Sequence, residues 1–259
     1  MHYRALIVLA LVLAIVLLVP AAFAQTPTPP DSGAACAPAT PCTDSPATTG
    51  LKLGSVAVET AAPAAEAAAE TVNAGFGLAW AVMALLLLSL LYAIVAAVFA
   101  TLGRELPALP EGSRVLIPIL SVLGLGVALY LTYVETQNVA AVCGPVGDCN
   151  AVQASPFAKL FGFLPVGLLG ALGYVGIIAA WFVARPGGAY SRIAALLMFG
   201  MALFGVLFTV YLTYLELFII HAVCIWCLSS AVLMSLVLIL SVGPALEVLQ
   251  VEELELEEE

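Results

Sequence analysis

The sequence predicts an all-α integral membrane protein: a four-helix bundle core with one additional preceding transmembrane helix and an N-terminal signal sequence or anchor helix. Of the 259 residues, 63% are hydrophobic and only 9% are charged. That much apolar surface exceeds what a single soluble core can bury. Several apolar runs also reach the roughly 20 residues that a helix needs to cross a bilayer. The lipid bilayer is therefore the first partner that the sequence predicts.

Residues 1–24 have the features of a signal peptide or of an uncleaved anchor helix. Arg4 supplies the positive start, an apolar stretch follows, and Ala22-Phe23-Ala24 fits the rule for a cleavage site. The apolar stretch is short for a full span, which favours cleavage. Residues 25–75 are rich in Pro, Ala and Thr, so we expect a disordered extracytoplasmic segment. Within it, residues 61–70 could form a loose helix that leads into the next span.

Five further apolar runs predict the membrane spans. The first lies in residues 76–103 and is the additional helix, whereas residues 114–243 form the four-helix core. Gly243-Pro244 is expected to end the last span. Residues 244–259 are then an acidic cytoplasmic tail, which we expect to be solvated and disordered. The apolar runs cover residues 76–101, 115–133, 164–184, 193–218 and 222–242.

Positive charges predict the orientation of the spans. If the spans alternate in direction, four arginines lie at one end of the bundle and two lysines lie at the other. An excess of Arg and Lys marks the cytoplasmic side. The prediction is a multi-pass protein of the cell (inner) membrane. The arginines are Arg104, Arg114, Arg185 and Arg192, and the lysines are Lys52 and Lys159.

Six cysteines form three local pairs, and alternating spans place all three pairs at the extracytoplasmic face. Paired cysteines that flank membrane spans indicate an oxidising compartment. One pair, Cys224 and Cys227, stands at the head of the last span, where free N–H groups and the helix dipole favour a thiolate. We call it the helix-head pair. Cys143 and Cys149 form the loop pair, and Cys36 and Cys42 form the third.

Two dithiols at one face of a membrane predict a thiol–disulfide relay and a redox-active centre. The loop pair lies in a glycine-containing loop that can move, as exchange between sulfurs requires. Cys149 would exchange with Cys224. Cys227, one turn deeper, would pass two electrons to a lipid-soluble carrier. A membrane quinone takes two electrons and two protons, which matches one dithiol. Ser155 could hydrogen-bond a quinone carbonyl, or it could cap the short helix after it.

Several motifs of the sequence together match one known pattern: the loop pair, the helix-head pair, Ser155, Phe161-Gly162-Phe163-Leu164-Pro165 and Gly173-Tyr174. With these motifs the chain resembles the vitamin K epoxide reductase family, in its bacterial type without a fused thioredoxin-like domain. The resemblance covers residues 115–242. It implies a four-helix bundle around a quinone, either ubiquinone or menaquinone, with Ser155 beside it. It also implies a quinone-dependent thiol–disulfide oxidoreductase, whose partner is a separate extracytoplasmic thioredoxin-like (DsbA-type) dithiol protein. Oxidation of that partner would support disulfide bond formation.

The resemblance also gives each cysteine a role. The loop pair matches the family's shuttle cysteines, Cys224 matches the cysteine that exchanges with the shuttle, and Cys227 matches the one that reacts with the quinone. A Tyr and an Asn contact the quinone in the animal enzyme, and this chain has Ala231 and Val166 near those places. That departure bears on epoxide reduction and leaves the thiol relay intact.

A non-enzymatic membrane protein, such as a transporter with structural disulfides, is the alternative. Two observations speak against it. No span carries a charge in mid-run, and three disulfides that close short loops would stabilise little. Residues 129–135 and 210–216 resemble each other and end in Glu135 and Glu216, which we expect to be solvated at outer helix ends.

Metal binding is the rival chemistry for the helix-head pair. His221 and the two sulfurs offer three ligands, whereas a structural zinc ion takes four. We therefore expect no metal. Nothing basic in the sequence suggests nucleic acid as a partner.

Overall fold

A computed structural model describes residues 61–102, 114–144, 147–184 and 190–257. Within these residues, five helices are long and apolar enough to cross a membrane. The predicted class, an all-α multi-pass membrane protein, is confirmed. Several residues that the sequence analysis singled out lie outside the described residues, namely the signal or anchor segment, Cys36, Cys42, Lys52, Arg104 and Arg185.

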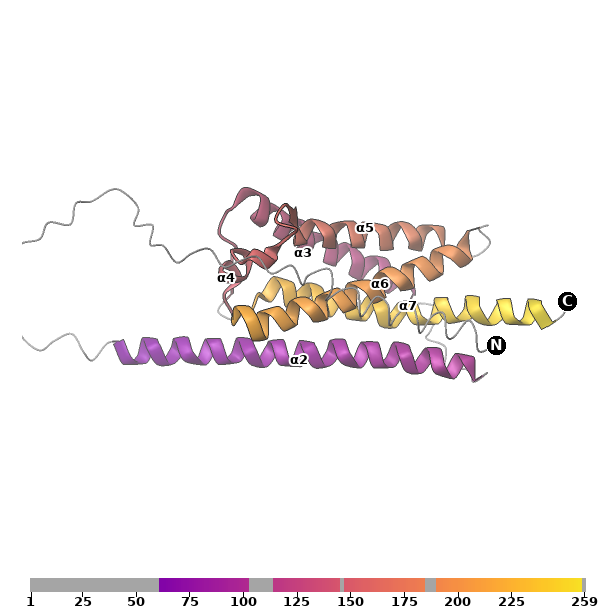
Figure 1. Cartoon of the computed structure of the whole chain (residues 1–259), viewed down its shortest axis with the longest axis horizontal. Coiled ribbons are helices and arrows are strands. Elements are labelled where there is room, and N and C mark those ends of the chain that lie inside the picture. Colours follow the sequence, from indigo (N-terminus) through magenta and orange to yellow (C-terminus); the bar gives the residue numbers. More distant parts are fainter. Residues whose placement is uncertain (1–60, 103–113, 145–146, 185–189, 258–259) are drawn as a thin grey trace, which may run out of the picture.

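Four of the long helices close into a bundle, and the fifth packs beside it. In the bundle, α3 contacts α5, α5 contacts α6, α6 contacts α7, and α7 returns to α3. Helix α2 runs along one side and contacts α7 and α6 (Figure 1). The predicted four-helix core with one preceding helix is therefore present. The long helices are α2 (Ala61–Thr101), α3 (Leu116–Gln137), α5 (Val166–Val183), α6 (Ser191–Leu215) and α7 (Ile225–Glu257).

Short elements between α3 and α5 sit at the end of the bundle opposite the C-terminus (Figure 1). They are α4 (Cys149–Gln153), the 3₁₀ turn η2 (Pro156–Ala158) and a two-stranded antiparallel hairpin of β1 (Lys159–Leu160) and β2 (Leu164–Pro165). At the same end, α6 continues into a π-helical turn, η3 (Glu216–Ile220). The described cysteines lie at this end, with Cys149 in α4 and Cys224 directly before α7.

Small residues let the helices of the core approach closely. A side chain at Gly124 of α3 would collide with the ring of Tyr174, 2.2 Å from the position of its Cβ. Tyr174 is fully buried, and its hydroxyl donates to the carbonyl oxygen of Ser230 in α7 at 3.0 Å. Close packing over small residues is how membrane helices associate, because lipid offers no hydrophobic drive. The contact joins three helices of the bundle.

The predicted end of the last span is wrong. Helix α7 passes through Gly243 and Pro244 and continues to Glu257, so the expected disordered tail is wrong as far as Glu257. A proline removes one backbone hydrogen bond, but membrane helices tolerate it where local adjustment satisfies the freed groups. Glu247 also forms an ion pair with Arg114, which precedes α3, and this contact fixes the extension of α7 to the bundle.

Candidate active site

The structure brings all four described cysteines into one cluster. Cys149 and Cys224 are fully buried, and Cys143 and Cys227 pack against the same apolar group. All four are free thiols. Each thiol interacts with the next in the order Cys143, Cys149, Cys224, Cys227. The sulfurs therefore form an unbroken row from a half-buried loop position to the interior of the bundle.

A tight backbone contact holds the loop pair against the helix-head pair. The backbone N–H of Asp148 donates to the carbonyl oxygen of Val223 at 2.9 Å, one residue before each cysteine of the contact. Gly147 has a φ of 87°, and a Cβ there would lie 2.3 Å from the Val223 oxygen. Asp148 also caps α4, since its Oδ1 accepts from the N–H of Ala151 at 3.0 Å. Gly147 is thus required both by conformation and by space.

Two aromatic residues hold the segment that carries Cys143. The indole N–H of Trp226 donates to the carbonyl oxygen of Val142 at 2.9 Å, and the N–H of Val142 donates to the Tyr130 hydroxyl at 2.8 Å. The two rings contact each other, with centroids 4.7 Å apart. Sequence reasoning missed this clamp, although Trp226 lies inside the Cys-x-x-Cys motif. That the loop moves during exchange stays a prediction.

The helix-head pair has the geometry expected at the start of a helix. Cys224 directly precedes α7, and its carbonyl oxygen accepts from the N–H of Leu228 at 3.0 Å. The N–H of Cys227 points at the Cys224 sulfur, at 3.3 Å. The Cys149 thiol lowers the pKa of Cys224, but the Cys227 thiol, burial and the Glu216 carboxylate outweigh it and raise that pKa. The helix head alone therefore does not make Cys224 a ready thiolate, contrary to the expectation from sequence.

The loop pair is also held as thiols. Burial, with the neighbouring Cys149 thiol, raises the pKa of Cys143 to about 11 from the ordinary value of 9.0. Hydrogen bonding to the Cys224 thiol, together with burial, raises the pKa of Cys149. Thiolates, not thiols, attack disulfides. Attack by either sulfur on a disulfide thus requires loss of a proton that the thiol holds more tightly than an ordinary cysteine does.

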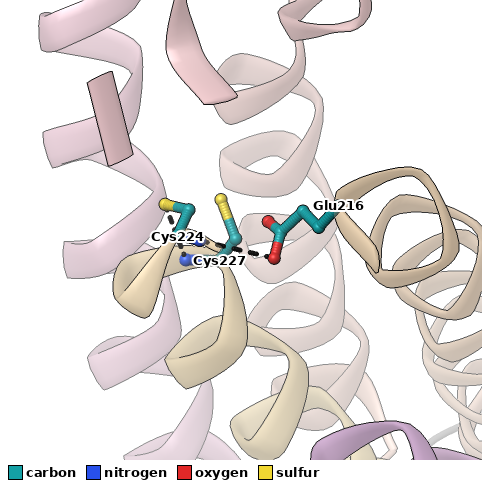
Figure 2. A group of neighbouring side chains, drawn as sticks. All are labelled: Glu216, Cys224 and Cys227. Atoms are coloured by element: carbon teal, nitrogen blue, oxygen red, sulfur yellow. Dashed lines mark hydrogen bonds between the residues drawn. The ribbon is translucent and has the colours of Figure 1, made fainter. Parts of the chain in front are cut away.

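Glu216 is buried and faces the helix-head pair, so the prediction that it is solvated is wrong. Its side chain is 3% exposed, and its Oε2 accepts from the N–H of Cys224 at 3.4 Å. One carboxylate oxygen and the sulfurs of Cys224 and Cys227 all lie within 4.8 Å of one another. Figure 2 shows the carboxylate reaching from its own helix toward the two sulfurs. The error arose because Glu216 lies in a π-helical turn that contacts α4 and the head of α7, and the sequence does not report these tertiary contacts.

Glu135 is buried as well, at 7% exposed, which makes the second prediction of a solvated acid wrong. Its carboxylate accepts from the N–H of Gly167 at 3.0 Å. That N–H is one of the free donors in the first turn of α5, where a negative charge is favourable. Glu135 therefore ties the end of α3 to the start of α5.

The zinc triad considered from the sequence does not assemble around His221. That residue is exposed, has a left-handed φ of 55°, and lies with its Nδ1 3.2 Å from the carbonyl oxygen of Ile219. Among the described residues, the cluster of potential ligand atoms at this site contains Glu216 in its place. The histidine beside the Cys-x-x-Cys motif was therefore a misleading signal. The side chain that lies beside the two sulfurs is that of Glu216, in the π-helical turn before the motif.

A cavity of about 630 Å³ lies between α3, α5, α6 and α7 and reaches the cysteine cluster. Its size is typical of sites for small molecules and cofactors. Of the four described cysteines, Cys227 lines it. Val166 and Ala231, which stand near the places of the quinone-contacting Tyr and Asn of the animal enzyme, line it too. The wall is mostly apolar. Its polar and ionisable side chains are those of Glu135, Gln153, Ser155, Tyr174, Thr209, Thr213, Glu216, Cys227 and Ser230.

Ser155 lines this cavity, but its hydroxyl is already engaged. Its Oγ donates to the carbonyl oxygen of Val152 at 2.7 Å. It also stands at the N-cap position of η2 and makes no side-chain capping bond there. Gln153 differs, because its buried Oε1 has no hydrogen-bond partner. Sequence reasoning named Ser155 and missed Gln153, for which no motif gave a signal.

A bundle of membrane-spanning helices that places four thiols beside an apolar cavity defines a membrane-embedded protein of the oxidoreductase class. Residues 115–242 match the model of the vitamin K epoxide reductase family, and the chain belongs to that family through this segment. The resemblance stated from the motifs is confirmed. Membership indicates a membrane disulfide oxidoreductase, and proteins of this family use quinones.

Proposed function

We propose that the protein takes electrons from a separate extracytoplasmic thioredoxin-like (DsbA-type) dithiol protein and passes them to a membrane quinone, which supports disulfide formation. The observation that carries the proposal is the row of thiols. Cys143 is partly accessible at one end, and Cys227 lines the cavity at the other. Electrons can therefore enter from a protein and leave to a lipid-soluble acceptor.

Exchange along the row starts with the loop pair reduced and the helix-head pair oxidised. The Cys149 thiolate attacks the Cys224 sulfur, forms a mixed disulfide and releases Cys227. The Cys143 thiolate then attacks Cys149, which closes the loop disulfide and releases Cys224. Two electrons have moved from the loop pair to the helix-head pair. The contact between Asp148 and Val223 holds Cys149 in reach of Cys224 for the first attack.

A bound quinone supplies an acceptor for two electrons and two protons. The cavity suits such a group because its wall is mostly apolar and Cys227 opens onto it. The Oε1 atom of Gln153 has no partner, and a flip of the side-chain amide would put its N–H group at that place to meet a quinone carbonyl oxygen. Ser155 would have to give up its bond to Val152 to do the same. Gln153 therefore joins Ser155 as a proposed quinone-binding residue.

The proposed location is the cell (inner) membrane, with the redox site on the extracytoplasmic face. Arg114 and Arg192 stand at the starts of α3 and α6, at the end of the bundle away from the cysteines. Positive residues concentrate on the cytoplasmic side. The charge pattern of the described residues supports this orientation.

Quinone reduction by the purified, fully reduced protein tests the proposal. A short-chain ubiquinone or menaquinone is added, quinol is followed by absorbance, and the Cys224–Cys227 disulfide is followed by mass spectrometry. We expect one quinol per helix-head disulfide formed. Cys36→Ser with Cys42→Ser is the control, which leaves the four relay cysteines in place. The proposal is contradicted if wild-type protein forms no quinol with either quinone, or if Cys227→Ser forms quinol as fast as wild type does. Either result favours a structural role for the cysteines.

A further inference from the structure

Among the described residues, Glu216 places a carboxylate beside the end of the thiol row, and the thiol relay gives it no role. Its carboxylate lies beside both sulfurs of the helix-head pair and is almost completely buried. One oxygen accepts from the backbone N–H of Cys224, and the carboxylate also bonds to the Cys227 side chain. The same residue lines the cavity. It therefore touches the thiol that faces the acceptor and the space in which the acceptor would sit.

Burying a carboxylate without a cationic partner is costly, so its place needs a reason. Among the described residues, no Lys or Arg pairs with Glu216 in a salt bridge. Its hydrogen-bond partners are a thiol and a backbone N–H. The thiol loses its proton when the sulfurs are oxidised. A buried carboxylate in such surroundings takes or gives a proton whenever the adjacent thiol does.

Oxidation of the helix-head pair creates that need. Two S–H bonds break, one S–S bond forms, and two electrons and two protons leave together. Both protons start in a protein interior in which Cys224 is fully buried. Without a nearby base, the thiolate that must react would form rarely, because its charge is poorly solvated there.

We propose that Glu216 is the acid–base residue of the helix-head pair: it accepts the Cys227 proton as the pair is oxidised and delivers it into the cavity. This inference rests on the proposed function, because it concerns the same electron transfer. The balance is complete. The dithiol loses two electrons and two protons, the quinone gains both and leaves as quinol, and Glu216 returns to its starting protonation state. In the preceding exchange step, Glu216 takes the proton that Cys149 loses and passes it to Cys227 as that sulfur is released, so Glu216 is again unprotonated when oxidation begins.

Other titratable groups near Glu216 are placed differently. Among the described residues they are Cys149 from α4, Cys224 directly before α7, Cys227 from α7, Glu135 from α3 and Tyr174 from α5. Glu135 accepts a bond from Gly167, and the Tyr174 hydroxyl donates to Ser230. Helix α2 meets the π-helical turn through Trp80 and Phe218, neither of which ionises. Glu216 is the carboxylate of this group with a cysteine as its hydrogen-bond partner.

Rapid-mixing measurements of quinol formation from pH 6 to 9 test the proposal. The full-length, reduced protein is mixed with a short-chain quinone, and wild type is compared with Glu216→Gln. Glutamine keeps an oxygen for the Cys224 N–H but cannot take a proton. We expect the rate at pH 7 to fall by about 10²–10⁴-fold, the range of general acid–base catalysis. The variant's rate should then rise about tenfold per pH unit, since free base must remove the proton. Glu247→Gln, an exposed acid at the opposite end of the bundle, is the matched control and should stay within about twofold.

Each outcome bears on one claim. A Glu216→Gln rate within threefold of wild type, with the same pH profile, overturns the role of Glu216. Wild-type protein that forms no quinol contradicts the proposed function instead. Time-resolved infrared spectra of wild-type protein keep the test decisive if the variant does not fold. A protonated-carboxyl band should appear transiently while the helix-head pair is oxidised and should still appear in Glu135→Gln, and spectra without such a transient band also overturn the role.

Discussion

Two similar segments of the chain perform different tasks at the same end of the bundle: residues 129–135 of α3, and residues 210–216 at the end of α6 and the start of η3. Each ends in a buried glutamate. In α3, Glu135 binds the N–H of Gly167, and Tyr130 holds the loop at Val142. In the second segment, Glu216 faces the helix-head sulfurs. The first segment positions parts of the protein, and the second contacts the cysteines of the proposed relay. The partner that each acid meets, not its local sequence, decides the difference.

Among the further tests, we expect the largest effect from disrupting the contact between the loop pair and the helix-head pair. Gly147→Ala forces a side chain into a left-handed conformation and against the Val223 oxygen. We expect electron transfer from the loop pair to the helix-head pair to slow by about 10- to 100-fold, because strain of about 1–3 kcal/mol would move Cys149 away. Quench-and-trap analysis of the two disulfides measures it. Direct quinone reduction by the helix-head pair should not change, and Gly126→Ala, with open space around it, is the control.

Glu135→Gln tests whether the α3 segment is a positioning element. The amide loses the charge that favours the first turn of α5, so we expect the free energy of unfolding to fall by about 1–3 kcal/mol. The rate of quinone reduction per folded molecule should fall much less than in Glu216→Gln. Thermal unfolding in detergent, alongside the rapid-mixing assay, gives both numbers. If the two variants instead show the same pattern of losses, the contrast between the segments is wrong.

Gln153→Leu sharpens the assignment of the cavity. Leucine has nearly the same size but no amide, so a quinone would lose one hydrogen bond worth about 1–1.5 kcal/mol. We expect KM for the quinone to rise about tenfold while kcat changes little. Ser155→Ala, compared in the same assay, should have a smaller effect, because its hydroxyl already bonds Val152. An unchanged KM in Gln153→Leu would remove Gln153 from the proposed quinone site.

The smallest expected effect concerns the accessibility of Cys143. Burial raises the pKa of Cys143 to about 11, so in reduced protein its alkylation rate should keep rising through pH 9, where an ordinary cysteine levels off. Tyr130→Phe removes the bond to Val142 and should speed alkylation at pH 8 by roughly threefold, as expected for the loss of one hydrogen bond. Tyr133→Phe is the control, because its side chain is exposed. A rate that already levels off near pH 9 in wild type would contradict the buried position of Cys143.

Several features of the fold and site followed from the sequence because they depend on local patterns. Apolar runs of span length predicted the five long helices, and α2, α3, α5, α6 and α7 occupy them. The spacing of Cys224 and Cys227 predicted a helix head, and α7 begins directly after Cys224. The end of α7 was missed because Gly243-Pro244 usually stops a helix in water, whereas a bundle in lipid can carry a helix through it.

The buried acids could not be predicted in the same way. Glu135 and Glu216 close helices whose ends look exposed in the sequence. They are buried because packing brings the start of α5 against Glu135, through the N–H of Gly167, and the head of α7 against Glu216, through the N–H of Cys224. Gln153 and Trp226 likewise gained their places through contacts with residues distant in the chain. No periodicity or short motif reports such contacts.

The sequence by itself determined a membrane protein of spanning helices with two dithiols at one end, because hydrophobic length and cysteine spacing are properties of local chain. The tertiary structure decided which sulfurs meet, which acid faces them and where the cavity opens. Those outcomes depend on helix packing, and packing brings together residues that the sequence keeps far apart.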